Sequence, residues 1–108
     1  MYYKHRISML YNMASNLIIH DRIRTTFGKA KSLAYLMNNL FKKISPMDTH
    51  SQKHARTIVR IPLAYKKLMN GLVDKYRQNM GGVVRIVRDP KTRLNDNSQM
   101  AYVEFLDK

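Results

Sequence analysis

Basic side chains are the commonest chemically active groups in this sequence, and they are spread along its whole length. Twenty lysines and arginines stand against seven aspartates and glutamates, which gives a formal net charge of +13. Eleven of these bases fall in residues 1–60 and nine in residues 61–108, so the charge is not confined to a tail. Guanidinium and ammonium groups bind phosphate oxygens through charge-assisted hydrogen bonds. The composition therefore indicates a polyanionic partner.

Two histidine motifs could do other chemistry. His20 precedes Asp21, but adjacent side chains on a helix or strand point apart, and no serine, cysteine or second-carboxylate motif accompanies the pair. His50 and His54 stand four residues apart, yet a closed zinc site needs four ligands and their segment has no cysteine or glutamate. We therefore expect no catalytic residue, no metal and no cofactor. His20 and Asp21 are instead expected to cap the first helix and its turn.

The length and the composition bound the class of protein. A chain of 108 residues can bury one modest core, so we expect a single domain over residues 1–108. The sequence has no cysteine, which excludes a disulfide framework and any cysteine-based zinc site. No apolar stretch approaches the length of a membrane span, and residues 1–20 lack the apolar region of a signal peptide. We expect no membrane association.

Four segments are expected to form helices. Three have the apolar spacing of amphipathic helices, whereas the third along the chain is polar and basic with weaker periodicity and suggests a shorter helix. Thr26 is a plausible N-cap of the second segment and Asp48 or Ser51 lies near the start of the third, because their oxygens can accept bonds from free backbone N–H groups. Pro62 suits the first turn of the fourth segment. The segments are residues 6–20, the stretch from Thr26 to Ser45-Pro46, residues 48–60, and the stretch from Pro62 to Gly81-Gly82.

Three segments have the pattern of strands. Residues 22–26 alternate charged and apolar side chains and end in two β-branched threonines, whereas residues 83–88 and 100–106 are rich in β-branched or aromatic residues. The last two segments predict a hairpin whose polar loop, residues 89–99, is longer than a hairpin requires. Because it also carries Lys91 and Arg93, with Arg88 directly before it, we interpret this loop as an arm that probes RNA. The order α-β-α-α-α-β-β predicts an α+β fold in two layers, with a small three-stranded sheet packed against helices.

Two groups of residues, one near each end of the chain, occur together at a characteristic spacing. The first group is His5-Arg6, Asn12-Met13-Ala14, Leu17, His20-Asp21, Ile23, Thr25-Thr26 and Lys29-Ala30-Lys31, and the second is Gly81-Gly82, Arg85-Ile86 and Met100-Ala101-Tyr102-Val103-Glu104. In this order and spacing the sequence resembles the L-seventeen family of bacterial-type large-ribosomal-subunit proteins. The resemblance covers nearly the whole chain, although residues 45–61 match only in outline.

The resemblance implies a structural, non-enzymatic ribosomal protein that supports translation. Such a protein binds large-subunit ribosomal RNA (rRNA) as the ribonucleoprotein assembles and contacts neighbouring ribosomal proteins, and it has no small-molecule substrate. Family members usually begin with a basic, glycine-containing arm, whereas only residues 1–4 precede the His-Arg pair here. This short amino end and a composition rich in Lys, Ile, Asn, Tyr and Met favour a mitochondrial ribosome. Another bacterial-type organelle ribosome or a bacterial cytoplasm is the alternative.

The charge pattern and the resemblance together predict the rRNA-binding residues. They fall before the first helix, on the first strand, at the start of the second helix, where the helix N-terminus adds backbone donors, and on the hairpin. Structured RNA is recognised mainly through shape, sugar hydroxyls and phosphates, so no base code is expected. The predicted residues are Lys4, His5, Arg6, Asn12, Arg22, Arg24, Thr25, Thr26, Lys29, Lys31, Arg85, Arg88, Lys91 and Arg93.

Two other classes of function remain open at this point. The same charge and helices would permit a stand-alone basic nucleic-acid-binding or assembly regulator, although the sequence lacks a separate recognition helix after a short glycine-containing turn. A small RNA-processing enzyme would need a cluster of carboxylates or histidines, whereas the seven acidic residues are scattered.

Overall fold

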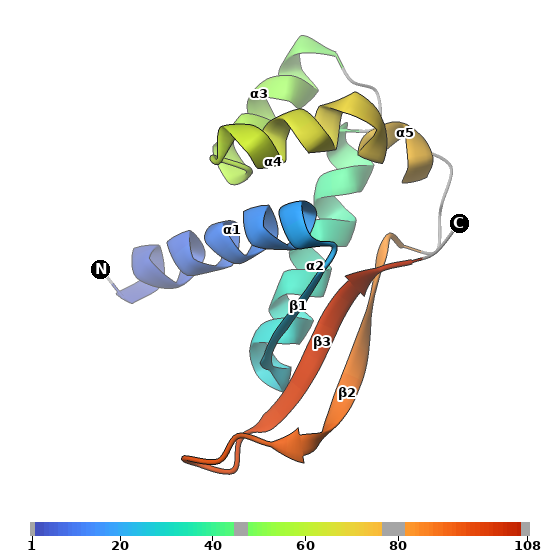
Figure 1. Cartoon of the computed structure of the whole chain (residues 1–108). Helices are drawn as coiled ribbons and strands as arrows, with labels where there is room; N and C mark the ends of the chain where they lie inside the picture. Colours follow the sequence, from blue (N-terminus) through green and yellow to red (C-terminus); the bar gives the residue numbers. More distant parts are fainter. Residues whose placement is uncertain (1, 45–47, 77–81, 107–108) are drawn as a thin grey trace.

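The computed structural model describes residues 2–44, 48–76 and 82–106, and it confirms the α+β class and the predicted order of elements (Figure 1). The helical segment after Pro62 consists of α4, the π-helical turn η1 and α5, with a kink at Gly71. The elements are α1 (Tyr2–His20), β1 (Arg22–Thr26), α2 (Phe27–Ile44), α3 (Thr49–Ile58), α4 (Pro62–Lys67), η1 (Leu68–Leu72), α5 (Val73–Tyr76), β2 (Val84–Thr92) and β3 (Gln99–Phe105).

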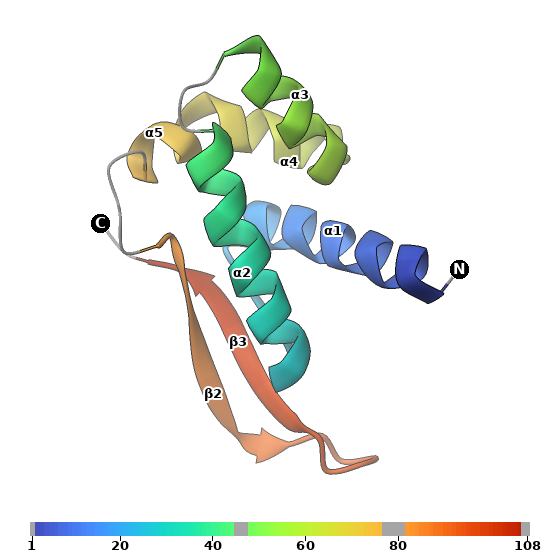
Figure 2. The ribbon, with the colours of Figure 1, turned by 180° about the vertical axis from the view of Figure 1, so that it is seen from behind.

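The three strands form an antiparallel sheet in the order β1-β3-β2. Ile23 and Ile86 both pair with Val103, the fully buried centre of β3, so one face of the sheet is apolar. Figure 2 shows α2 lying across one face of the sheet, and in Figure 1 no helix of the described segments covers the other face. The fold therefore has two layers, and one sheet face is left to solvent.

Helix α2 is the centre of the core because its apolar residues recur every three or four positions and form one continuous stripe. It packs against the sheet on one side and contacts α1, α3 and α5 on the other. Helix α1 is amphipathic as well, and the residues Ala14, Leu17 and Ile18 of its apolar face are fully buried. The buried residues of α2 are Ala30, Leu33, Met37, Leu40, Phe41 and Ile44.

Three aromatic rings join the helices to the end of the sheet. Phe41, Tyr76 and Phe105 have ring centroids 5.7 to 6.0 Å apart, in edge-on, tilted and stacked pairs. The Tyr76 hydroxyl donates a hydrogen bond to the carbonyl oxygen of Leu106. These contacts connect α5 to α2 and to the carboxyl end of β3, so the two layers are held together at this end.

Helix α1 ends at His20, and Asp21 turns the chain into β1. Asp21 has a left-handed backbone (φ 68°), and its N–H donates to the carbonyl oxygen of Leu17 at 2.7 Å. The Lys67 ammonium group donates to the carbonyl oxygen of Ile19 at 3.2 Å and to the Asp21 carboxylate at 3.0 Å. The prediction is confirmed for Asp21, whereas the capping role of His20 stays a prediction, and Lys67 is a partner that the sequence did not reveal.

Gly82 is required where the chain enters β2. Its φ of +108° is a left-handed conformation, and a Cβ placed there would lie 3.1 Å from the Asn38 side-chain oxygen. That oxygen accepts a hydrogen bond of 2.8 Å from the backbone N–H of buried Val83. Gly82 therefore permits the contact that attaches the start of β2 to α2.

Substituting Gly82→Ala is expected to lower the free energy of unfolding by about 1 to 3 kcal/mol, because alanine would adopt a strained φ and crowd Asn38. Urea denaturation followed by circular dichroism measures the change. Gly28→Ala is the matched control, since Gly28 lies in the first turn of α2 and a methyl group added there would meet nothing within 4 Å. The control is expected to be neutral or stabilising by up to about 1 kcal/mol. Equal losses in the two variants would contradict the role of Gly82.

The first and fourth helices differ from their predictions. Helix α1 begins at Tyr2, so Lys4, His5 and Arg6 lie on its first turns and the prediction that they precede the helix is wrong. No proline or glycine in residues 2–6 interrupts the helix. The helix after Pro62 is not regular, because Gly71 has non-helical dihedrals (φ 160°, ψ −30°) within η1.

The predicted start of α3 is confirmed, and two predicted helix ends lie outside the described residues. Asp48 is the N-cap of α3 and accepts a hydrogen bond of 2.8 Å from the N–H of Ser51. This contact lowers the pKa of Asp48 below its ordinary value. Thr26 directly precedes α2, as a cap must, and its capping hydrogen bond stays a prediction. The ends predicted at Ser45-Pro46 and Gly81 fall on residues that are not described.

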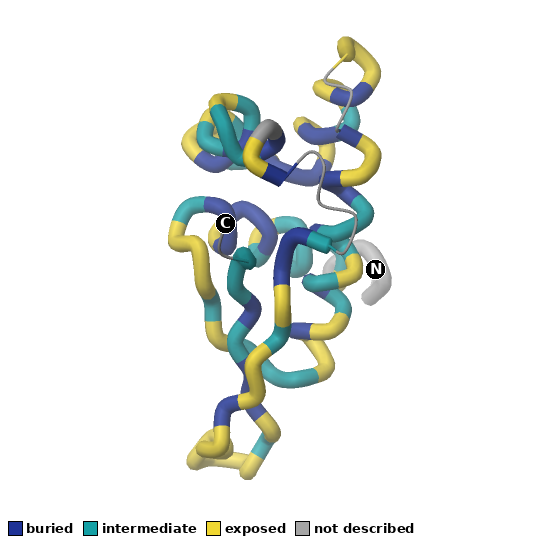
Figure 3. The backbone as a smooth tube through the Cα atoms, turned by 90° about the vertical axis from the view of Figure 1, so that its right-hand side faces the viewer, coloured by how far each residue is buried: buried dark blue, intermediate teal, exposed yellow. Residues whose placement is uncertain are grey.

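The predicted loop of the hairpin is too long. Strand β2 continues to Thr92, and only residues 93–98 form the turn. The register shifts between Arg88 and Thr92, because Pro90 has no N–H for the ladder and the Asp89 side chain is buried. The result is a long hairpin that projects from the body of the protein, and its far end is exposed (Figure 3).

Candidate nucleic-acid interface

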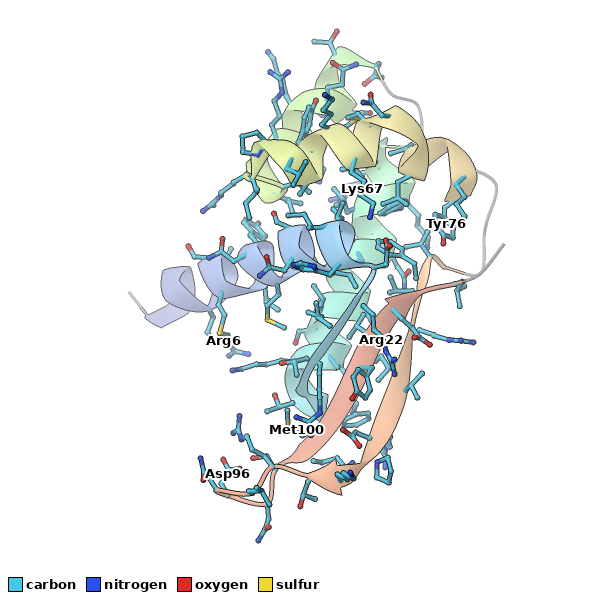
Figure 4. The ribbon with its side chains drawn as sticks, in the orientation of Figure 1. Arg6, Arg22, Lys67, Tyr76, Asp96 and Met100 are labelled. Atoms are coloured by element: carbon cyan, nitrogen blue, oxygen red, sulfur yellow. The ribbon has the colours of Figure 1, made fainter. Side chains whose placement is uncertain are left out.

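The uncovered face of the sheet carries a row of arginines around one carboxylate. The register places Arg22 and Arg85 on either side of Glu104, whose oxygens lie 3.4 and 2.8 Å from the two Nε atoms. The Arg22 guanidinium also lies 3.8 Å from the ring centroid of Tyr102, and Figure 4 labels Arg22 on this face. Both arginine side chains remain more than half exposed. Their guanidinium planes are thus oriented by the sheet yet open to a further acceptor.

Arg24 is held by a buried carboxylate of the hairpin. Its Nε donates to Asp89 at 2.7 Å, and the backbone N–H of Lys91 donates to the same carboxylate at 3.0 Å. The Asp89 side chain is only 10% exposed, and the two donors, first Lys91 and then Arg24, lower its pKa below the ordinary value. This pair connects strands β1 and β2, which are not adjacent in the sheet. Arg24 is therefore a positioned hydrogen-bond donor more than a source of net charge.

A groove runs where α1, β1 and the first turns of α2 meet, and we call it the β1 groove. It consists of two adjoining hollows of about 530 Å³ each, which share Met9 and Lys29. Among its lining residues are three strong bases and no carboxylate. The free N–H groups at the start of α2 lie beside it, and such groups favour anions. The lining residues are Arg6, Met9, Leu10, Met13, Asn16, His20, Ile23, Arg24, Thr25, Thr26, Gly28, Lys29 and Ser32.

The far end of the hairpin forms a second basic surface that begins at the same arginine. Lys91 and Arg93 line a shallow hollow of about 870 Å³ together with Arg24. Arg93 forms two hydrogen bonds to Asp96, of 3.0 and 2.7 Å, which raise the pKa of Arg93 and lower that of Asp96. These bonds order the turn, at which Leu94 is 97% exposed. Because Arg24 lines both hollows, the hairpin surface continues into the β1 groove.

The structure brings together most of the residues predicted to bind rRNA, but not all of them. Lys31 does not line the β1 groove and, like Arg88, contacts the ring of Phe27, with distances of 4.7 and 4.3 Å to the centroid. Asn12 is exposed on α1 outside the groove lining. The side chains of Lys4 and His5 are not described. The predicted residues that gather in the β1 groove are Arg6, Arg24, Thr25, Thr26 and Lys29.

Sequence reasoning missed the residues that position the arginines. Glu104, Asp89 and Tyr102 were not assigned any contact, although each supports a predicted arginine. Alternation along β3 places Tyr102 and Glu104 on one face, and this signal is visible in the sequence. Their pairing with Arg22 and Arg24 depends on the register between strands about 80 residues apart, which the sequence alone does not specify.

The contact between Arg24 and Asp89 is expected to make the hairpin sensitive to acid. Because the pKa of Asp89 is lowered in the folded protein, its contribution to stability is present above the ordinary value of 3.8 and is lost as pH falls through the lowered pKa. Unfolding in urea at pH 7, 5 and 3 should therefore show a loss at pH 3 that is smaller in the Asp89→Asn variant. Identical pH dependence in both proteins would contradict this role.

Other chemistry finds little support in the described part of the chain. No three histidine, cysteine, aspartate or glutamate side chains gather there in a group that could hold a metal ion. His50 is exposed on α3, and His54 is half-buried one turn later. No described helix is long and apolar enough to span a membrane.

A bare sheet face carrying arginines, a basic groove and a projecting basic hairpin together define a class of protein. These features belong to an α+β domain in which several of the cations lie on one connected surface, as in proteins that bind nucleic acid through phosphates.

Comparison with known proteins identifies the family. A family model described as Ribosomal protein L17 matches residues 9–106, and the chain belongs to this family. It is 38% identical over 103 residues to the large ribosomal subunit protein bL17 of Porphyromonas gingivalis, which covers 95% of this chain and 64% of that protein. The bL17 proteins of Orientia tsutsugamushi and Maricaulis maris are 34% and 36% identical, over 96% and 98% of this chain. The chain spans 71% and 75% of their lengths.

Proposed function

We propose that this protein is a structural, non-enzymatic constituent of the large subunit of a bacterial-type ribosome. In this role it binds and stabilises large-subunit rRNA as a single domain over residues 1–108. The observation that carries the proposal is the β1 groove, where three elements bring Arg6, Arg24 and Lys29 together with no carboxylate in the lining. The relatives' name, large ribosomal subunit protein bL17, supports the same role.

The chemistry of this binding is neutralisation and positioning of phosphates. Folded RNA brings phosphates close together, and cations placed between them reduce their repulsion and fix their geometry. Arg22, Arg24 and Arg85 suit this task, because carboxylates orient their guanidinium groups before RNA arrives and the side chains keep 39 to 55% of their surface exposed. Glu104 and Asp89 offset part of the positive charge of these arginines. The sheet face therefore contributes mainly shape complementarity to the RNA, whereas the β1 groove contributes more of the net electrostatic attraction.

The finer assignments extend this proposal. The fourteen residues predicted from the sequence are proposed to contact rRNA, with the sheet face, the β1 groove and the hairpin forming one surface. Neighbouring large-subunit proteins are the proposed protein partners. A mitochondrial ribosome is the proposed location, on the composition of the chain.

Salt-gradient sedimentation of a lysate tests the proposal by following this protein against large-subunit rRNA. A protein held only by about 6 to 10 phosphate contacts loses about 10³- to 10⁵-fold in affinity between 50 and 200 mM salt. An integrated ribosomal protein is therefore expected to stay with the large subunit through this range. Early release, or migration with DNA or a smaller RNA, would contradict the proposal and favour a stand-alone nucleic-acid-binding regulator.

A further inference from the structure

A second groove lies apart from the sheet face and the hairpin and adjoins the β1 groove. We call it the α3 groove, because α1, α2 and α3 line its sides, and it has a volume of about 600 Å³. Figure 2 shows α1 and α3 lying beside α2, and the three helices contact one another. Its floor is apolar and includes Leu36, Leu40 and Ile58.

Two tyrosines give this groove aromatic walls. Tyr35 lines it from α2 and is 74% exposed, so its ring is open to a ligand. Tyr11 lines it from α1 and is half-buried, with the Arg60 guanidinium 5.1 Å from its ring centroid. An exposed aromatic ring beside an apolar floor is a surface on which a flat ligand can stack.

The rim of the α3 groove is basic. Lys31, Lys43 and His54 line it, and none of its lining residues is an aspartate or a glutamate. Lys31 and Lys43 are exposed on α2. The ligand that complements this groove therefore has a flat aromatic part and a negative charge. A nucleotide has both, since its base can stack on tyrosine while its phosphate approaches a lysine.

The position of the α3 groove favours RNA over an acidic segment of a neighbouring protein. Leu10 and Ser32 line both this groove and the β1 groove, so the two adjoin across α1 and α2. An RNA strand bound in the β1 groove could therefore extend directly into the α3 groove. The two grooves together extend the basic surface around the start of α2.

We propose that the α3 groove holds an unpaired nucleotide of the bound RNA, with its base stacked on Tyr35 and its phosphate near Lys31 or Lys43. This inference rests on the proposed function, because it assumes that the β1 groove binds rRNA. It assigns a site outside the sheet face and the hairpin.

Ultraviolet cross-linking of intact large subunits, followed by mass spectrometry of tryptic peptides, tests the site. A nucleotide adduct is expected on residues 32–42, the peptide that contains Tyr35. A cross-link from this peptide to another protein would overturn the proposal and identify a protein partner instead. RNA adducts on β1-groove peptides with none on residues 32–42 would overturn the nucleotide site alone. RNA adducts on neither would overturn the proposed function as well.

Substitutions provide a readout that does not depend on cross-linking. Tyr35→Ala is expected to lower affinity for large-subunit rRNA by about 10- to 100-fold, whereas Tyr35→Phe keeps the ring and should bind normally. The melting temperature of the free protein should change in neither variant, because Tyr35 is exposed. Leu63→Ala is the matched control, as Leu63 is 63% exposed and lines neither groove. Normal binding by Tyr35→Ala would overturn the proposal.

Discussion

Replacing Arg6, Arg24 and Lys29 together with glutamine is expected to prevent stable incorporation of this protein into the large subunit. These three residues are the strong bases that line the β1 groove, and they come from three different elements, with Arg24 oriented by Asp89. Losing two or three phosphate contacts should reduce the salt dependence of binding by about two units of slope, and affinity by on the order of a hundredfold near 150 mM salt. Filter binding to large-subunit rRNA across a salt series measures both quantities.

The control for this variant removes the same charge elsewhere. Lys53, Lys66 and Lys75 are exposed on α3, α4 and α5 and line none of the grooves described above. Changing all three to glutamine should alter affinity much less than the groove variant. Glutamine at position 24 still offers a donor to Asp89, so circular dichroism of the free groove variant should match that of the wild type. Equal losses in both triple variants would show that net charge, and not the groove, carries binding.

Substituting Leu33→Ala is expected to lower the free energy of unfolding by about 2 to 5 kcal/mol. Leu33 is fully buried in the middle of the α2 stripe, so truncation removes apolar contact and leaves a cavity at the centre of the core. A domain of this size is stable by only about 5 to 15 kcal/mol, so the variant should be close to its unfolding limit. Urea denaturation at 25 °C gives the value.

Leu63→Ala is the control for the core substitution as well. The same side chain is removed from a position that is 63% exposed, and its effect should stay within about 0.5 kcal/mol. A loss below about 1 kcal/mol for Leu33→Ala would mean that α2 is not packed between the sheet and the helices as described. A large decrease in the free energy of unfolding for both variants would indicate that the whole domain is only marginally stable.

The helices were predictable because their signals are local. The apolar residues from Ala30 to Ile44 recur at the spacing of one helix face. The residues of α2 that are buried in the structure belong to this predicted set. Asp48 needed only its own carboxylate and the N–H of Ser51, three residues away, to begin α3. The strand at residues 22–26 was likewise visible in its alternation.

The hairpin was predicted in outline but not in length. Asp89 and Pro90 were assigned to a loop, because aspartate and proline are usually depleted from strands. In the structure a register shift accommodates Pro90, and Asp89 is buried because Arg24 reaches it from β1. The partner that keeps Asp89 inside the fold lies 65 positions away, so no local pattern could indicate it.

Signals between residues close together in the chain were enough to predict the class of fold, the helices, the first strand and the family, because periodicity, capping and motif spacing are local. The basic character of the surface followed from composition. Which bases act together became clear only in three dimensions. Packing of α1 and α2 beside β1 places Arg6 in one groove with Lys29, and the register of β3 places Glu104 between Arg22 and Arg85. These arrangements depend on long-range packing and strand register, which no short segment specifies.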